Sequence, residues 1–174
     1  LLGRIACFRS PVKYDALKAL AETKFNAKTS GRKGAKEKES SASSRPGVFA
    51  LSLDADLRDL VARGLLHHDA KEGRFDLHPI VRRYAYDRLT APDRAAVHTR
   101  LRDYFAAVPR PDKVTRLEDL APVIELYHHT VRAGQFDEAF TLLCDRLVPN
   151  PLHFQFGAYQ LMIELKLALF PDGE

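Results

Sequence analysis

The sequence has no long apolar stretch and few cysteines. A bilayer span needs about 20 apolar residues, and no window of the 174 residues approaches this length. The first residues also lack the layout of a secretory signal, so we expect a cytoplasmic protein with no membrane contact. Cys7 and Cys144 are far apart within apolar helical patterns. This predicts two buried free thiols rather than a disulfide or a zinc site.

Sequence motifs for catalysis are also missing. There is no G-x-x-x-x-G-K-[ST] loop to hold a triphosphate, and no H-E-x-x-H or C-x-x-C arrangement. The pairs His67-His68 and His128-His129 are adjacent in sequence. Neighbours on a strand point to opposite faces, and neighbours on a helix diverge by about 100°, so neither pair can chelate one metal ion. We therefore expect no catalytic residue, no metal site and no enzyme activity.

The positive charge is concentrated in one segment. Residues 24–45 contain seven lysines and arginines and two glutamates, a net charge of +5, whereas the whole chain carries +4. The rest of the chain is therefore slightly acidic. The segment 24–47 has hardly any large apolar side chain, which predicts a disordered basic insert within the first domain. A solvated spacer explains this basicity better than a folded surface that binds nucleic acid.

Residues 1–90 carry the patterns of a winged-helix domain. Apolar stripes predict two short helices, one over 1–8 and one around 14–21. A third helix starts near Leu53, with Ser52 or Asp54 as its cap. It ends at Gly64.

A β-hairpin and a closing helix complete this domain. Residues 65–69 and 74–78 flank a turn that contains glycine, and Pro79 begins the closing helix. The side chains of that helix expected to face inward are Ile80, Val81, Tyr84, Ala85 and Leu89, while Arg82, Arg83, Asp87 and Arg88 are expected in solvent. Helices, hairpin and closing helix together predict a winged helix.

Residues 91–174 show helical patterns only. A helix starts at Thr90 and runs to Pro109. After a proline-rich connector, a helix over 120–132 and another from 135 predict a tight pair separated by Ala133-Gly134. Residues 152–169 are apolar on more than one side, which predicts a helix packed between neighbours in a stack. We expect this array to continue past Glu174.

Three segments resemble one class of signalling proteins. Residues 73–85, GRFDLHPIVRRYA, resemble the winged helix that follows the nucleotide-binding domain of signal-transduction ATPases with numerous domains, the STAND class. Residues 1–11 are similar to the entry helix of that domain. Residues 127–139, YHHTVRAGQFDEA, are similar to the tetratricopeptide-type repeats that follow it. The resemblance implies a mainly α fold: a winged helix over 1–90, then antiparallel helix pairs of an α-solenoid over 91–174.

The resemblance also implies a role for His78. In the STAND class the equivalent histidine belongs to a Met-His-Asp-type motif and contacts the β-phosphate of bound ADP in the inactive state. Here the motif is Leu77-His78-Pro79, so the acidic third residue is replaced by proline. We expect His78 to contact the ADP phosphate only in a full-length parent protein, because this fragment holds no cofactor itself. The alternative is that His78 caps or packs at a helix start.

The implied function is regulatory. The fragment would relay the ADP or ATP state of an upstream nucleotide-binding domain to a helical array that binds a protein partner. Candidate partner-binding side chains are Tyr127, His128, Phe136 and Phe140, which at helical spacing are also typical of a core. The alternative function is a winged-helix transcriptional regulator that binds DNA. The acidic residues expected on the third helix would repel phosphates and disfavour it.

Overall fold

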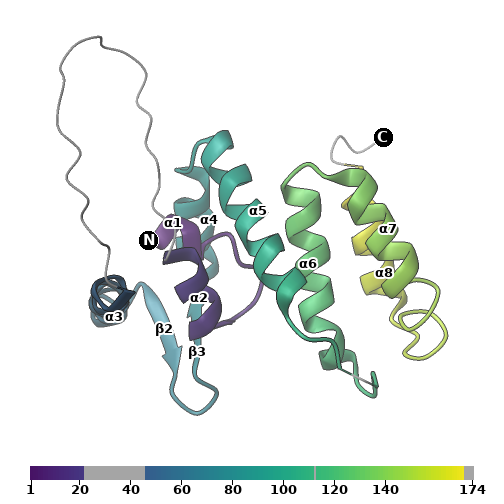
Figure 1. The fold of residues 1–174 in the computed structure, drawn as a ribbon, viewed down its shortest axis with the longest axis horizontal. Coiled ribbons are helices and arrows are strands. Elements are labelled where there is room, and N and C mark those ends of the chain that lie inside the picture. Colours follow the sequence, from purple (N-terminus) through teal and green to yellow (C-terminus); the bar gives the residue numbers. More distant parts are fainter. Residues whose placement is uncertain (22–45, 112, 171–174) are drawn as a thin grey trace, which may run out of the picture.

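The structure is a computed structural model that describes residues 1–21, 46–111 and 113–170, with residues 46–52 described by their backbone alone (Figure 1). The predicted basic insert, 24–47, lies outside the described residues except for 46–47, which begin a helix. The fold is mainly helical with one small antiparallel sheet. This confirms the predicted mainly α class.

The first part of the chain mixes helices and strands. Its elements are α1 (Leu2–Ile5), β1 (Val12–Lys13), α2 (Tyr14–Ala21), α3 (Pro46–Ala62), β2 (Leu66–Asp69), β3 (Arg74–Leu77) and α4 (Pro79–Asp87). The strands form an antiparallel sheet in the order β1-β3-β2. The predicted hairpin is confirmed, with Leu66 opposite Leu77 and Gly73 at a φ of +60° in its turn. A positive φ of this kind suits glycine, which lacks a Cβ.

Within the described residues, the second part of the chain contains helices and no strand. Its elements are α5 (Ala91–Ala107), the 3-10 helix η1 (Leu117–Leu120), α6 (Ala121–Arg132), α7 (Phe136–Arg146) and α8 (Tyr159–Leu167). The predicted start of α5 is confirmed, since the Thr90 hydroxyl accepts a hydrogen bond from the Asp93 amide at 3.3 Å. Gly134, with a φ of +79°, separates α6 from α7 as predicted. Helices α5, α6 and α7 lie side by side across the molecule (Figure 1).

Two hydrophobic cores hold these parts together. The first joins α1, α2, α3, the sheet, α4 and α5, and includes the fully buried Leu17 and Leu101. The second joins η1, α6, α7 and α8, and includes Tyr127 and Leu143. Helix α5 belongs to the first core and α6 to the second, and the two helices pack against each other. The contact between α5 and α6 therefore connects the two cores.

The strand β1 was not predicted. Val12 and Lys13 pair with Phe75 and Arg74 of β3. Two residues are too few to show an alternating pattern, so only the neighbouring strand identifies them as a strand.

Two predicted helix boundaries were wrong. Helix α3 begins at Pro46, so Ser52 and Asp54 lie inside it instead of capping it. Helix α8 begins at Tyr159 rather than near 152, because residues 150–156 form turns. Within the described residues, α8 buries Leu165 but leaves Tyr159, Ile163 and Leu167 exposed, so it is not packed between two neighbours.

The predicted inner face of α4 was also partly wrong. Ile80 is 74% exposed and Tyr84 is 60% exposed. Ala85 of α4 and Leu89, which follows it, do face inward as predicted and lie against α1, where a Cβ at Gly3 would be only 3.0 Å from Leu89 Cδ2. This close contact turns Ile80 and Tyr84 toward solvent.

Arg82 and Cys144 also differ from prediction. Arg82, expected in solvent, is half-buried and donates to Asp76 at 2.5 Å. Cys7 is buried as predicted, but Cys144 is exposed because it lies on the outer face of α7. Of the helices that the structure describes, none has the length and apolar character required to cross a bilayer.

Candidate functional site

His78 lies at the first turn of α4 and is exposed. Its Nδ1 accepts a hydrogen bond from the Ile80 amide at 3.3 Å, so the side chain caps the helix. Because Nδ1 is the acceptor, the proton of a neutral ring resides on Nε2. The ring nitrogen that is not engaged in the cap is therefore a donor, which is the form required to contact a phosphate oxygen.

The exposed face of α4 continues from His78 along the helix. Ile80 and Tyr84 are the large apolar side chains on this face. The guanidinium of Arg88 lies 5.2 Å from the centre of the Tyr84 ring, at cation–π distance. We call His78, Ile80, Tyr84 and Arg88 the α4 outer face. It combines a hydrogen-bond donor, apolar area and positive charge.

The opposite side of α4 leads into a buried polar chain. The Tyr86 hydroxyl lies 3.2 Å from Nε2 of His98 on α5. Nδ1 of His98 lies 3.0 Å from Nδ1 of His129 on α6. Nε2 of His129 faces Glu125 Oε2 at 3.6 Å, and Ser10 Oγ donates to Glu125 Oε1 at 2.6 Å. We call these five residues the polar seam.

The seam permits only two coordinated proton arrangements. If the Tyr86 hydroxyl donates to His98, then His98 Nδ1–H donates to His129, and His129 Nε2–H points at Glu125. In the reverse arrangement His98 Nε2–H donates to Tyr86, and His129 presents a bare nitrogen to Glu125. At 3.6 Å the His129–Glu125 contact is too long for a hydrogen bond, and neither His129 Nε2 nor Glu125 Oε2 has a hydrogen-bond partner among the described residues. Hydrogen-bonding groups therefore connect Tyr86 to His98 and His129, and the seam reaches Glu125 only through a 3.6 Å contact.

Burial keeps the histidines of this region neutral. Burial is the main cause that lowers the pKa of His98 to about 4, of His128 to about 3 and of His129 to about 2. The positive charge of Arg132 adds to the effect at His98 and His128. Burial raises the pKa of Glu125. Low polarity thus disfavours charge on both sides of the His129–Glu125 contact.

A basic cavity adjoins the seam. It has a volume of about 350 Å³ and is lined by Arg9, Arg82, Arg83, Arg132, His98 and His128, among others. The Arg82 guanidinium donates to the Arg9 carbonyl at 2.6 Å, which ties α4 to the segment after α1. These guanidinium groups give the surface beside the seam a positive potential.

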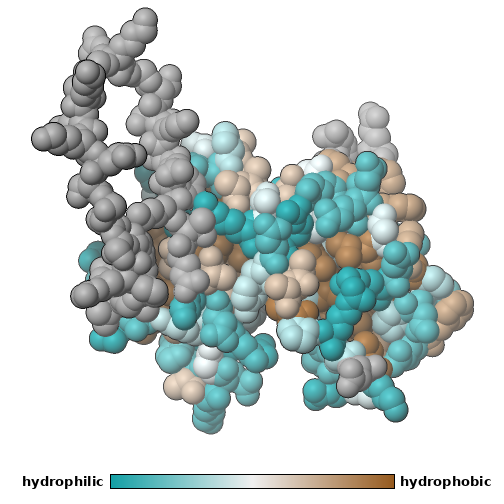
Figure 2. Space-filling view, in the orientation of Figure 1, coloured by the Kyte–Doolittle hydropathy of each residue, from teal (hydrophilic) through white to brown (hydrophobic). Residues whose placement is uncertain are grey.

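The structure separates the four predicted partner-binding residues. Tyr127 is fully buried, and its hydroxyl donates to the Leu165 carbonyl at 2.5 Å, so it offers no surface to a partner. His128 is half-buried in the basic cavity. Phe136 and Phe140 are 40% and 58% exposed on α7. Hydrophobic side chains are visible at the surface of the half of the molecule that holds α6, α7 and α8 (Figure 2). Of the four, Phe136 and Phe140 are the available contacts.

Sequence reasoning missed His98 and Glu125, and it considered His129 only as a metal ligand beside His128. A signal was present, because His98 lies three residues before the buried Leu101 on α5, and Glu125 and His129 are four residues apart on α6.

In the described part of the chain, no group of three or more His, Cys, Asp or Glu side chains is arranged to hold a metal ion. The site therefore offers hydrogen bonds and positive charge.

No family model matches the sequence, and neither a curated protein nor a solved structure matches it significantly.

Proposed function

We propose that this chain is a non-catalytic regulatory and protein-interaction fragment of a multidomain signalling ATPase of the STAND class. It relays the nucleotide state of an upstream domain to a helical array. The observation that carries the proposal is the polar seam, which connects α4 to α5 and α6 through hydrogen-bonding groups 3.2 Å and 3.0 Å apart.

The arrangement of the first part supports a winged helix. The order α1-β1-α2-α3-β2-β3, with strand order β1-β3-β2, places a helix pair before a hairpin that pairs with the first strand. The helix α4 follows the hairpin directly. In this proposal the α4 outer face docks on the nucleotide-binding domain, where His78 Nε2–H reaches the β-phosphate of ADP.

The second part supports a tetratricopeptide-like array. Helices α6 and α7 form a helix pair across the turn at Gly134, and α5 packs against α6. Stacked helix pairs of this kind present extended surfaces to protein partners. Phe136 and Phe140 are the side chains proposed for that contact, and the protein acts in the cytoplasm.

The relay follows from the two sides of α4. Docking or release of the outer face shifts α4, and Tyr86 on its other side moves relative to His98. A hydrogen bond tolerates little displacement. When α4 shifts, either α5 and α6 move together with it or the hydrogen bonds of the polar seam break. Two discrete packings of this kind are the physical basis of a switch.

The DNA-binding alternative has less support. Asp56 and Asp59 are exposed on α3, the helix that would enter the major groove. The guanidinium of Arg63 is held by Asp59 at 2.8 Å, so it is not available to a phosphate. Negative charge at this position opposes phosphate contacts.

The test is nucleotide-linked activity in the full-length parent protein. We expect His78→Ala to weaken ADP binding by about tenfold, the effect of one lost hydrogen bond to a charged group, and to raise basal output. His67→Ala, an exposed histidine on β2, is the matched control. Unchanged ADP affinity and output in His78→Ala would reduce His78 to a helix cap.

Tyr86→Phe tests the relay separately. It removes the hydroxyl that faces His98 and keeps the ring. We expect ADP affinity to stay near the wild-type value while output no longer follows the nucleotide state. Normal coupling in Tyr86→Phe would refute the seam as the path of the signal.

A further inference from the structure

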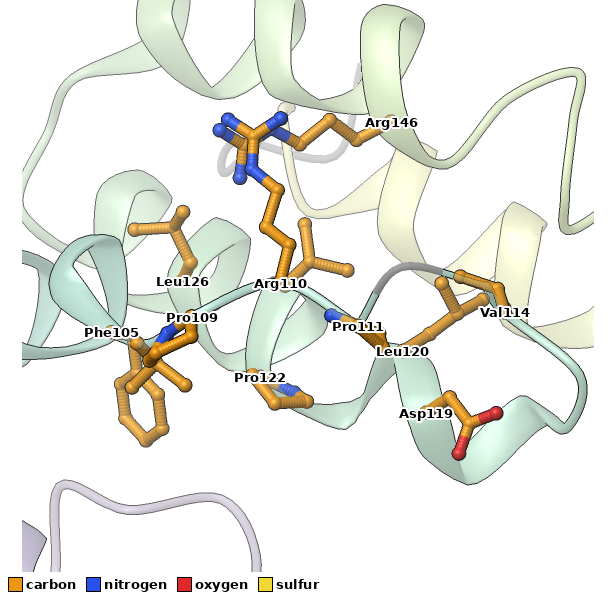
Figure 3. Close-up of a pocket in the computed structure, with 12 residues that line it drawn as sticks. Phe105, Pro109, Arg110, Pro111, Val114, Asp119, Leu120, Pro122, Leu126 and Arg146 are labelled. Carbon is orange, nitrogen blue, oxygen red and sulfur yellow. The ribbon is translucent and has the colours of Figure 1, made fainter.

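A second cavity lies beside the connector between α5 and α6 (Figure 3). Its wall residue Phe105 stacks on the seam residue His129, with the ring centres 5.5 Å apart. Its volume is about 180 Å³. Its wall is mainly apolar and includes Phe105, Val108, Leu120, Val123 and Leu126. An apolar wall of this kind binds the apolar body of a ligand without contributing hydrogen bonds.

Two arginines line the same cavity. Arg110 comes from the connector and Arg146 from the last turn of α7. Figure 3 shows both side chains extending to the same side of the cavity. In the described part of the chain, no carboxylate pairs with either guanidinium. Two positive charges at one opening repel each other, and a bound anion would convert this repulsion into attraction.

The acidic residue of the cavity wall does not serve as that anion. The carboxylate of Asp119 accepts hydrogen bonds from the amides of Thr115 and Arg116, both at 2.9 Å. These bonds lower the pKa of Asp119, so it is ionised but engaged with its own loop. In Figure 3 its oxygens point away from Arg110 and Arg146. Asp119 therefore does not neutralise the two guanidinium groups, and among the described residues their positive charge is available to a ligand.

The volume limits the size of that ligand. An apolar cavity of about 150 Å³ accommodates benzene, whereas pockets for drug-sized molecules measure about 300–1,000 Å³. A cavity of about 180 Å³ therefore has room for a single ring or a short branched chain.

The geometry points to a binding site for a small apolar carboxylate. Its ring or branched chain fills the apolar wall, and its carboxylate lies between Arg110 and Arg146, where a guanidinium can form two parallel hydrogen bonds. A free aromatic acid and the last residue of a peptide chain present the same chemistry. This site goes beyond the proposed relay and does not depend on it, because it shares no residue with the polar seam or the α4 outer face.

Isothermal titration of the protein with benzoate and with phenylacetate tests the site. We expect saturable binding of one molecule per chain. Arg110→Met and Arg146→Met should each weaken binding by about tenfold, since a hydrogen bond to a charged group is lost. Arg88→Met, which removes a guanidinium from the α4 outer face, is the matched control and should leave binding unchanged.

Two further ligands separate the contributions of charge and apolar contact. Benzyl alcohol keeps the ring and lacks the charge, and acetate keeps the charge and lacks the ring. Both should bind at least about tenfold more weakly than benzoate. Val123→Phe, which fills part of the wall and retains both arginines, should also weaken benzoate binding and serves as a second variant if Arg146→Met does not fold.

Short peptides ending in phenylalanine, with a free or an amidated C-terminus, identify the source of the ligand. Tighter binding of the free-terminus peptide than of benzoate supports a protein terminus, and the opposite order supports a free acid. The proposal is overturned if neither benzoate nor the peptide binds, or if both arginine variants bind benzoate as the wild type does. Neither result would bear on the His78 test.

Discussion

The two sides of α6 are built from different chemistry. Toward α5, the helix buries polar groups: the four buried polar or charged residues of the described part, His98, Glu125, His129 and Thr130, all lie on α5 or α6. Toward α7 and α8 it buries an apolar core, to which Tyr127, Val131, Leu143, Leu147 and Leu165 belong. One helix thus carries a polar contact and an apolar contact side by side.

The apolar side of α6 stabilises the fold, whereas the polar side restricts which arrangements of the helices are allowed. Apolar packing accepts several arrangements of similar free energy, provided that volume is conserved. A buried polar network accepts only arrangements in which every donor has an acceptor, because an unpaired buried group is costly. The α5–α6 contact is therefore the part of the molecule suited to two defined states, and the α6–α7–α8 core is suited to remaining intact.

Acidification should break the polar side first. The folded chain lowers the pKa of His98 to about 4, His128 to about 3 and His129 to about 2, against about 6.5 in an unfolded chain. Between these values the unfolded state binds more protons, so the free energy of unfolding falls as pH falls. Glu125 opposes this trend, since its raised pKa lets the folded state take up a proton first. We expect a net loss on the order of 5 kcal/mol from pH 6.5 to 4.5, measured by urea denaturation at each pH.

A histidine-free seam is the control for this pH dependence. The double variant His98→Leu/His129→Leu should lose most of the slope between pH 6.5 and 4.5, because two of the three titrating groups are gone. His67→Gln, on the exposed surface of β2, should keep the wild-type slope. A double variant with the wild-type slope would show that other groups cause the acid sensitivity.

Truncation on the apolar side should cost stability without changing the pH dependence. Leu143 is 2% exposed in the second core, so Leu143→Ala should lower the free energy of unfolding by about 2–5 kcal/mol through lost burial and a residual cavity. Phe140→Ala, on the same helix at 58% exposure, should change it by less than about 0.5 kcal/mol. Both variants are measured by urea denaturation at neutral pH. Equal losses of unfolding free energy would contradict the placement of Leu143 on the buried face of α7 and Phe140 on its exposed face.

A double-mutant cycle on the polar side should give the smallest effect. His98→Leu leaves the Tyr86 hydroxyl and His129 Nδ1 without a partner, at a cost of about 1–3 kcal/mol. His129→Leu should cost a similar amount. The double variant should lose less than the sum of the two, since it removes both members of the pair. Strict additivity in chemical denaturation would mean that the 3.0 Å contact contributes no coupling.

Local signals predicted much of the fold. Gly64, Gly73 and Gly134 have positive φ values where a helix end, a turn and a helix pair were expected. Pro79 begins α4, and Thr90 caps α5. These features depend on one residue and its immediate neighbours, so they can be recognised without the tertiary structure.

The failures depend on tertiary contacts. Ile80, Tyr84 and Ala85 all have the spacing of a buried face, but the close approach of α4 to α1 buries only Ala85 of these three. Most contacts of the polar seam join residues far apart in the sequence: Tyr86 and His98 are 12 positions apart, His98 and His129 are 31 apart, and Ser10 and Glu125 are 115 apart. No single helix pattern contains these pairings. The same is true of the cavity between Arg110 and Arg146, which forms only after the connector folds over α6.

The Tyr127 hydroxyl bond to the Leu165 carbonyl provides a built-in spectroscopic probe. The chain has no tryptophan and six tyrosines, so tyrosine dominates its near-ultraviolet spectrum. Tyr127 is fully buried and held against α8. Near-ultraviolet circular dichroism requires such fixed packing, whereas the far-ultraviolet signal reports helix content alone. Detachment of α8 would therefore weaken the tyrosine band while the helical signal persists, so the docking of this last helix can be followed without any label.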